Sequence, residues 1–161
     1  MTTLYTIGYE GASLTDFVAT LHKAGIKHVL DIRDVPQSRR PGFSKNVLAS
    51  ALSREDIAYT HLKPLGDPKE GREAARRGDH EEFIRIFEAH LTRTDATEAL
   101  RNAAELVCAE PTTLLCYERD PKTCHRTIVS ERLREVCSLN VQHLGVRHNA
   151  SRQLSTVAQA A

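Results

Sequence analysis

The stretch richest in side chains that could take part in chemistry is "LLCYERDPKTCHR", residues 114–126. In it, two cysteines, a glutamate, a histidine and an arginine follow a short apolar run. We expect Cys116 and Glu118 to lie on one face at the end of a strand, with Tyr117 on the opposite face. A carboxylate at a strand end beside arginines can act as a general base or bind a ribose hydroxyl. The alternatives are a salt bridge for Glu118 and an ordinary core position for Cys116.

The triplet Cys124, His125 and Arg126 is expected in the first turn of a helix, which begins at Thr123 or at the Asp-Pro pair 120–121. Free backbone N–H groups and the helix dipole favour an anion there, and the planar fork of Arg126 suits phosphate or carboxylate. The same field would lower the pKa of a Cys124 thiol. A reactive cysteine and a purely structural triplet are the alternatives. Neighbouring helical residues point about 100° apart, so we do not expect His125 to serve as the base for Cys124.

A metal site would need ligands from Cys116, Cys124, His125 and His61. The spacing of the first three is irregular beside the closely paired cysteines of common zinc sites, so no metal site is predicted. We expect all four cysteines to be thiols, because no secretion signal precedes them. Cys108 and Cys137 are expected in the core.

The strongest electrostatic signal is the loop "DIRDVPQSRRPGFSK", residues 31–45, which holds Arg33, Arg39, Arg40 and Lys45. Basic side chains beside an aromatic suit a nucleotide or a nucleic-acid backbone, and Phe43 is the expected stacking surface. A solvated basic loop balanced by neighbouring carboxylates is the alternative. The arginines at 72, 76 and 77 alternate with glutamates and are expected on a solvated helix face.

The short motif "GYEG", residues 8–11, lets the backbone turn sharply between two glycines, and it places Tyr9 and Glu10 directly after a strand. It is far weaker than a dinucleotide fingerprint and is not interpreted as one. We expect Glu10 and Glu118 to be catalytic, although Glu10 could also be a solvent-facing carboxylate. The expected substrate-binding residues are Tyr9, Asp31, Arg33, Arg39, Phe43, Lys45, His61, Cys124, His125 and Arg126.

Strand-like and helix-like segments alternate along the chain, which predicts a parallel sheet covered on both faces. The predicted fold is a three-layer Rossmann-like α/β domain with about five mostly parallel strands, formed by residues 1–146 and followed by a tail, 147–161. The richest loops follow the first, second and fourth strands, which favours the strand order 3-2-1-4-5. The predicted strands are 3–8, 26–35, 57–62, 112–117 and 139–144, and the predicted helices begin near 13, 46, 79, 95 and 124.

Composition excludes several classes of protein. The composition, 40% hydrophobic and 27% charged residues, is typical of a globular protein. A net charge of +1 gives no general attraction to nucleic acid or membrane. No apolar run approaches the roughly 20 residues that span a bilayer. We therefore expect a cytoplasmic protein with no membrane partner.

The motifs "TIGYEG", "DIRDVPQSRRPGFSK", "HLKPLG" and "LLCYERDPKTCHR" occur in this order between residues 6 and 126. Together they resemble the domain of unknown function 488 family. The resemblance implies a compact α/β domain of bacterial or archaeal type and no established reaction.

Three functions remain open. The first is an enzyme, a hydrolase or transferase, that acts on a nucleotide, nucleotide-sugar or nucleic-acid end in a cleft at the carboxyl edge of the sheet. The second is a non-catalytic module that binds a nucleotide or nucleic acid. The third is a thiol redox protein that uses Cys116 and Cys124. The expected partner is an anionic small molecule or a nucleic-acid end, and the sequence indicates neither a cofactor nor an oligomeric state.

Overall fold

A computed structural model describes residues 1–151, and these form an α/β domain around one five-stranded sheet. Every strand pairing is parallel, and the order is β3-β2-β4-β1-β5. The prediction of a Rossmann-like α/β fold is confirmed. The strands are β1 (Thr2–Gly8), β2 (His28–Asp31), β3 (Ala58–His61), β4 (Thr112–Cys116) and β5 (Leu139–Leu144).

The predicted strand order, 3-2-1-4-5, is wrong. Strand β4 lies between β2 and β1, with Leu114 beside Leu30 on one side and beside Thr6 on the other. All five residues of β4 are buried, so this strand gains most from the centre of the sheet. The prediction required only that strands one, two and four be neighbours. Both orders meet that condition.

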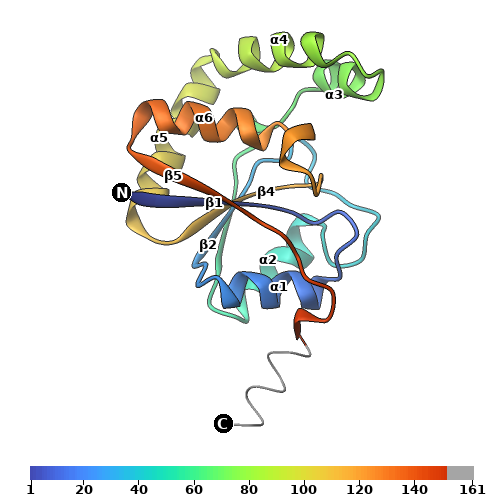
Figure 1. Cartoon of the computed structure of the whole chain (residues 1–161), viewed down its shortest axis with the longest axis vertical. Coiled ribbons are helices and arrows are strands. Elements are labelled where there is room, and N and C mark those ends of the chain that lie inside the picture. Colours follow the sequence, from blue (N-terminus) through green and yellow to red (C-terminus); the bar gives the residue numbers. More distant parts are fainter. Residues whose placement is uncertain (152–161) are drawn as a thin grey trace.

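Helices cover the sheet on both faces, as Figure 1 shows. The face below the sheet in that view carries α1 (Leu14–Lys23) and α2 (Lys45–Ser53). The other face carries α5 (Thr94–Ala109) and α6 (Arg126–Val136), with α3 (Lys69–Arg76) and α4 (His80–Leu91) beyond them. Each face has its own apolar core, because successive strand residues point to opposite sides.

Two helix starts follow their sequence signals. The Oγ of Ser13 accepts a hydrogen bond from the backbone N–H of Asp16, and Asp79 caps α4 in the same way through Glu82. The helix α6 begins later than predicted, because residues 121–123 form a separate 3-10 turn, η2 (Pro121–Thr123). A second 3-10 turn, η1 (Lys63–Leu65), follows β3.

The chain beyond β5 returns to α1. The carboxylate of Asp16 accepts hydrogen bonds from the backbone N–H groups of Asn149 and Ser151. This contact fixes the first part of the predicted tail, while residues 152–161 lie outside the described residues. None of the helices in the described part of the chain has the length and apolar character needed to span a bilayer.

Candidate functional site

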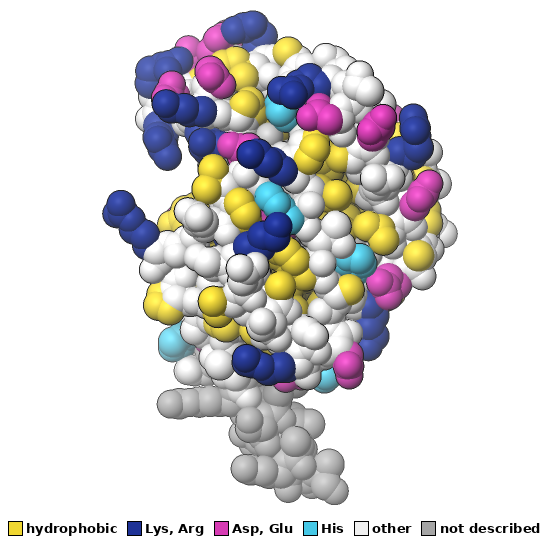
Figure 2. Space-filling view, turned by 180° about the vertical axis from the view of Figure 1, so that it is seen from behind, with side chains coloured by type: hydrophobic (Ala, Val, Ile, Leu, Met, Phe, Trp, Pro, Cys, Tyr) yellow, Lys and Arg dark blue, Asp and Glu magenta, His cyan; other side chains and the backbone are white. Residues whose placement is uncertain are grey.

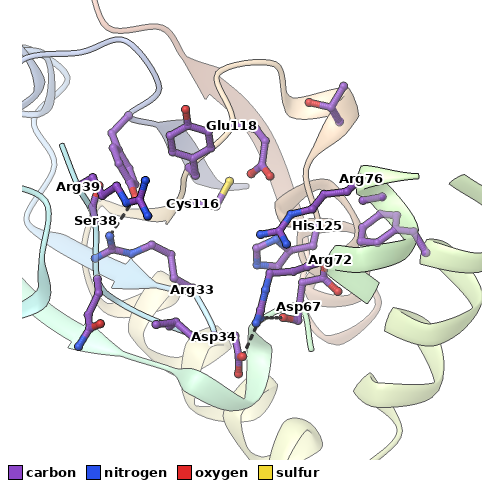
Figure 3. A pocket seen from close by; sticks show the side chains of 17 residues that line it. Arg33, Asp34, Ser38, Arg39, Asp67, Arg72, Arg76, Cys116, Glu118 and His125 are labelled. Atoms are coloured by element: carbon purple, nitrogen blue, oxygen red, sulfur yellow. Dashed lines mark hydrogen bonds and ion pairs between the residues drawn. The ribbon is translucent and has the colours of Figure 1, made fainter. Parts of the chain in front are cut away.

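A cavity of about 700 Å³ lies at the carboxyl edge of the sheet, between the loops that follow β1, β2 and β4 and the helix α3. Figure 3 shows Arg33 and Arg39 on one side of it and Arg72, Arg76 and His125 on the other. Lysines and arginines, interspersed with acidic residues, also gather over the α3 end of the molecule in Figure 2. The cavity is lined by Tyr9, Arg33, Asp34, Val35, Gln37, Ser38, Arg39, Asp67, Arg72, Ala75, Arg76, Phe83, Cys116, Tyr117, Glu118, Thr123 and His125.

Arg33 is held rigidly in the wall of the cavity. Its Nε and Nη2 donate to the two carboxylate oxygens of Asp31 at 2.9 and 2.7 Å, and its Nη1 donates to the carbonyl oxygen of Phe43 at 2.6 Å. Burial alone would lower the pKa of Arg33, but the hydrogen bonds and charge of Asp31 outweigh burial and raise it. Asp31 is fully buried behind it and also accepts from the hydroxyl of Tyr59.

The opposite wall comes from α3. The Nη1 of Arg72 donates to the carboxylate of Asp34 and to the backbone oxygen of Asp67, each at 2.7 Å. Arg76 lies one turn further along α3 and is exposed. The expectation of a solvated helix face fits the exposed Arg76 and Arg77, whereas Arg72 is half-buried and ion-paired with Asp34. Arg72 and Arg76 also line the cavity, and Arg77 does not.

Two guanidinium groups remain uncommitted at this site. Within residues 1–151, Arg39 and Arg76 make no salt bridge and no side-chain hydrogen bond, although both line the cavity. All the N–H donors of these two guanidinium groups are therefore available to an anionic ligand.

Asp67 is a lining residue that the sequence analysis did not single out. It is 7% exposed, and its Oδ1 is buried without a hydrogen-bond partner in the described part of the chain. Burial raises its pKa to about 7; the charge of Arg72 opposes this rise, and the charges of Glu118 and Asp34 add to it. The available signal was its position in the turn after β3, where the strand-end rule places ligand-binding groups.

Glu118 lines the same cavity from the loop after β4. Burial raises the pKa of its carboxyl group, the charge of Arg126 lowers it, and the charge of Glu10 raises it. Cys116 lies on the same side of β4, while Tyr117 packs edge-on against Tyr9 on the other side, as alternation predicts.

Glu10 does not share this cavity. It is exposed, accepts a hydrogen bond from the backbone N–H of Arg119 at 3.0 Å, and lines a separate hollow of about 420 Å³ beside Arg40 and Arg147. Of the expected site residues, one cavity is therefore lined by Tyr9, Arg33, Arg39, Glu118 and His125, while Glu10 lines the separate hollow.

Arg126 is fully buried and does not line the cavity. Its guanidinium donates to Thr6 Oγ1 at 3.1 Å, to Cys116 Sγ at 3.2 Å, and to the backbone oxygens of Glu118 and Arg119. This places Arg126 as a clamp between β1 and the loop after β4, rather than in the ligand-facing position that we expected.

Cys124 and Cys116 are joined as a disulfide, so the expectation of four free thiols is wrong for this pair. Cys124 is extended (φ −122°, ψ 145°) and precedes the helix, which removes the 100° helical offset from His125. His125 Nδ1 lies 3.7 Å from Cys124 Sγ, and Nε2 lies 2.7 Å from the carbonyl oxygen of Ile32. Burial lowers the pKa of His125 to about 4.

The other two cysteines also differ from their expected core positions. Cys108 is exposed and Cys137 is half-buried. Burial, and to a lesser extent the neighbouring Cys108, raises the pKa of the Cys137 thiol.

Of the remaining candidates, Phe43 and His61 contact residues that line the cavity, and within residues 1–151 Lys45 does not. Phe43 is fully buried and stacks on Tyr9 with ring centroids 4.5 Å apart, so it belongs to the core and offers no exposed stacking surface. His61 Nε2 lies 2.7 Å from the carbonyl oxygen of Arg33, and Lys45 is an exposed residue at the start of α2. Neither His61 nor Lys45 lines the cavity.

The fold and the site together define a Rossmann-like α/β protein with an arginine-rich cavity at the carboxyl edge of a parallel sheet. The family model described as Domain of unknown function DUF488 matches residues 13–133, and the chain belongs to that family. A search of curated proteins and a search of solved structures each found no match.

Proposed function

We propose that this protein is an enzyme, a hydrolase or transferase, acting on a phosphate-bearing substrate: a nucleotide, a nucleotide-sugar or a nucleic-acid end. The observation that carries the proposal is one cavity that combines four arginines with the buried carboxylate of Asp67, whose Oδ1 has no hydrogen-bond partner among residues 1–151.

Phosphate binding falls to the arginines with uncommitted donors. Arg33 and Arg72 are already paired with carboxylates, so they orient the site, while Arg39 and Arg76 supply charge and hydrogen bonds to the ligand. A cavity of about 700 Å³ is in the size range of pockets that take nucleotide-sized molecules.

Asp67 is the proposed general acid–base. A pKa of about 7 means that the protonated and ionised forms coexist at neutral pH, which suits proton transfer to or from a reacting oxygen. The acid–base role moves from Glu10 to Asp67, because Glu10 lies outside the cavity. Glu118 lines the cavity and can accept a hydrogen bond from a substrate hydroxyl.

The test begins with a thermal-shift screen of orthophosphate, nucleotides, nucleotide-sugars and 5′-phosphorylated oligonucleotides, since a ligand of the native state raises the melting temperature. Arg76→Ala should weaken the best ligand about 10- to 100-fold, the loss expected for a charged hydrogen bond. Arg77→Ala is the matched control, because it removes the same charge one residue away and outside the cavity. Equal effects of the two variants would remove Arg76 from the site.

Turnover of the best ligand is then measured by chromatography of its products. Asp67→Asn should abolish turnover while the ligand still binds. A ligand that binds through Arg76 and is never converted by the wild-type protein would favour the second candidate, a non-catalytic nucleotide- or nucleic-acid-binding module.

A further inference from the structure

Three potential metal ligands meet beside the cavity. The Sγ atoms of Cys116 and Cys124 and a carboxylate oxygen of Glu118 all lie within 4.8 Å of one another. The imidazole Nδ1 of His125 is 3.7 Å from Cys124 Sγ and brings a fourth donor to the group. Two thiolates, an imidazole and a carboxylate form a donor set that suits zinc and similar thiophilic divalent ions.

The orientation of His125 matches that of a metal-bound histidine. A carbonyl oxygen can only accept, so the nitrogen that faces the carbonyl of Ile32, Nε2, carries the proton. The other nitrogen, Nδ1, is left with a lone pair directed toward Cys124. Histidines that bind metals almost always donate their second ring N–H to a carbonyl or carboxylate in this way.

The distances fit a tetrahedral ion. Bonds of about 2.3 Å to sulfur and about 2.0–2.1 Å to nitrogen, at a tetrahedral angle, place the two ligand atoms about 3.6 Å apart. The distance between Cys124 Sγ and His125 Nδ1 is 3.7 Å. The Cα atoms of Cys116 and Cys124 are 7.5 Å apart, wider than the roughly 4.4–6.8 Å usual for a disulfide, so the backbone also suits two ligands of one ion.

The charge balance points the same way. Arg126 is fully buried, and its direct acceptors among the described residues are a hydroxyl, two backbone oxygens and Cys116 Sγ. A buried guanidinium needs a compensating negative charge. The charges of Glu118 and Asp120 act on Arg126 without a direct hydrogen bond. A thiolate at Cys116 would place a negative charge in direct contact at 3.2 Å, and the N–H donated by Arg126 stabilises a sulfur ligand.

We propose that the reduced protein binds one thiophilic divalent cation of the zinc class through Cys116, Cys124 and His125, with Glu118 as the fourth ligand. Reduction of the disulfide by a phosphine adds two electrons and two protons, and the thiols release their protons when the metal binds. Because Cys116, Glu118 and His125 also line the cavity, the ion lies in its wall. This metal site stands independently of the proposed phosphate-bearing substrate.

The experiment uses the full chain without an affinity tag, reduced with a phosphine, and then given Zn²⁺ or Co²⁺ alone. After gel filtration, elemental analysis should find one zinc ion per chain, and a chromogenic chelator gives its affinity. Co²⁺ should produce sulfur-to-cobalt charge-transfer bands and the intense visible bands of a tetrahedral site. These measurements on the wild-type protein need no variant to fold.

Variants then locate the ion. Cys124→Ser should abolish the charge-transfer bands or weaken them strongly, and His125→Gln should lower zinc affinity at least about 10-fold. The matched control is the double variant Cys108→Ser/Cys137→Ser, which removes the other cysteine pair and should still bind one ion. Reduced wild-type protein that binds no zinc, or binding lost only in the control, would overturn the proposal.

Discussion

Replacing Asp67 with asparagine should stabilise the protein at alkaline pH and leave it almost unchanged at acid pH. The pKa of this carboxyl group is about 7 in the folded protein and about 3.8 when the chain is unfolded. Between these values, the folded protein holds a proton that the unfolded chain has released. Stability therefore falls as the pH rises from about 4 to about 7, and the full cost is present above pH 7.

The size of the effect follows from the pKa difference. Each pKa unit corresponds to about 1.4 kcal/mol, so ionising Asp67 in the folded state costs at most about 4 kcal/mol. Water in the open cavity screens the charge and reduces this cost. We expect Asp67→Asn to gain about 2–4 kcal/mol at pH 8.5 and close to nothing at pH 4.

Urea unfolding of both proteins at several pH values measures this difference directly. Glu70→Gln is the control, because it removes an exposed carboxylate on α3 and so separates loss of charge from loss of buried charge. A difference between Asp67→Asn and wild type that stays constant from pH 4 to pH 8.5, or that favours wild type at high pH, would refute the assignment of a raised pKa.

Three further predictions concern stability. Gly8→Ala should cost more than about 2 kcal/mol, because its Cβ would lie 1.8 Å from the backbone oxygen of Glu118; thermal unfolding tests this, and an unchanged melting temperature would contradict the packing. Arg126→Met should lower the free energy of unfolding by at least about 3 kcal/mol, since it leaves several buried acceptors without donors. Urea unfolding measures this loss, and a smaller one would argue against the clamp. Phe43→Ala should lower the free energy of unfolding by about 3–5 kcal/mol, because it leaves a cavity beside Tyr9. A variant that is fully stable but binds ligand more weakly would instead show that Phe43 contacts the ligand.

Much of the fold was readable from periodicity and turn residues. Five strands and most of the helices lie where apolar patterns place them, because burial of one face is a local demand that the sequence records. Strand order is a different kind of information. Exchanging β1 and β4 leaves every local pattern intact, and the two arrangements differ only in which strands pair across the sheet.

The site was predictable in outline but not in detail. The rule that ligand groups follow the strands of a parallel sheet placed Arg33 and Glu118 at one edge correctly. It also applies to Asp67, which follows β3, but it could not place Arg72 or Arg76, because their approach to that edge depends on where α3 packs in the fold. Long-range packing of this kind leaves no short-range signal.

The arginines show why counting charges along the chain is not enough. A buried guanidinium must satisfy its donors inside the protein, and Arg33 and Arg126 do so through Asp31, backbone oxygens, hydroxyl groups and sulfur. These two guanidinium groups hold loops in place and have few N–H donors left for a ligand. Exposed arginines such as Arg39 and Arg76 keep theirs. Within residues 1–151, Arg39 and Arg76 make no ion pair and no side-chain hydrogen bond, so an anion in this cavity would meet their free donors within a frame that the buried arginines fix.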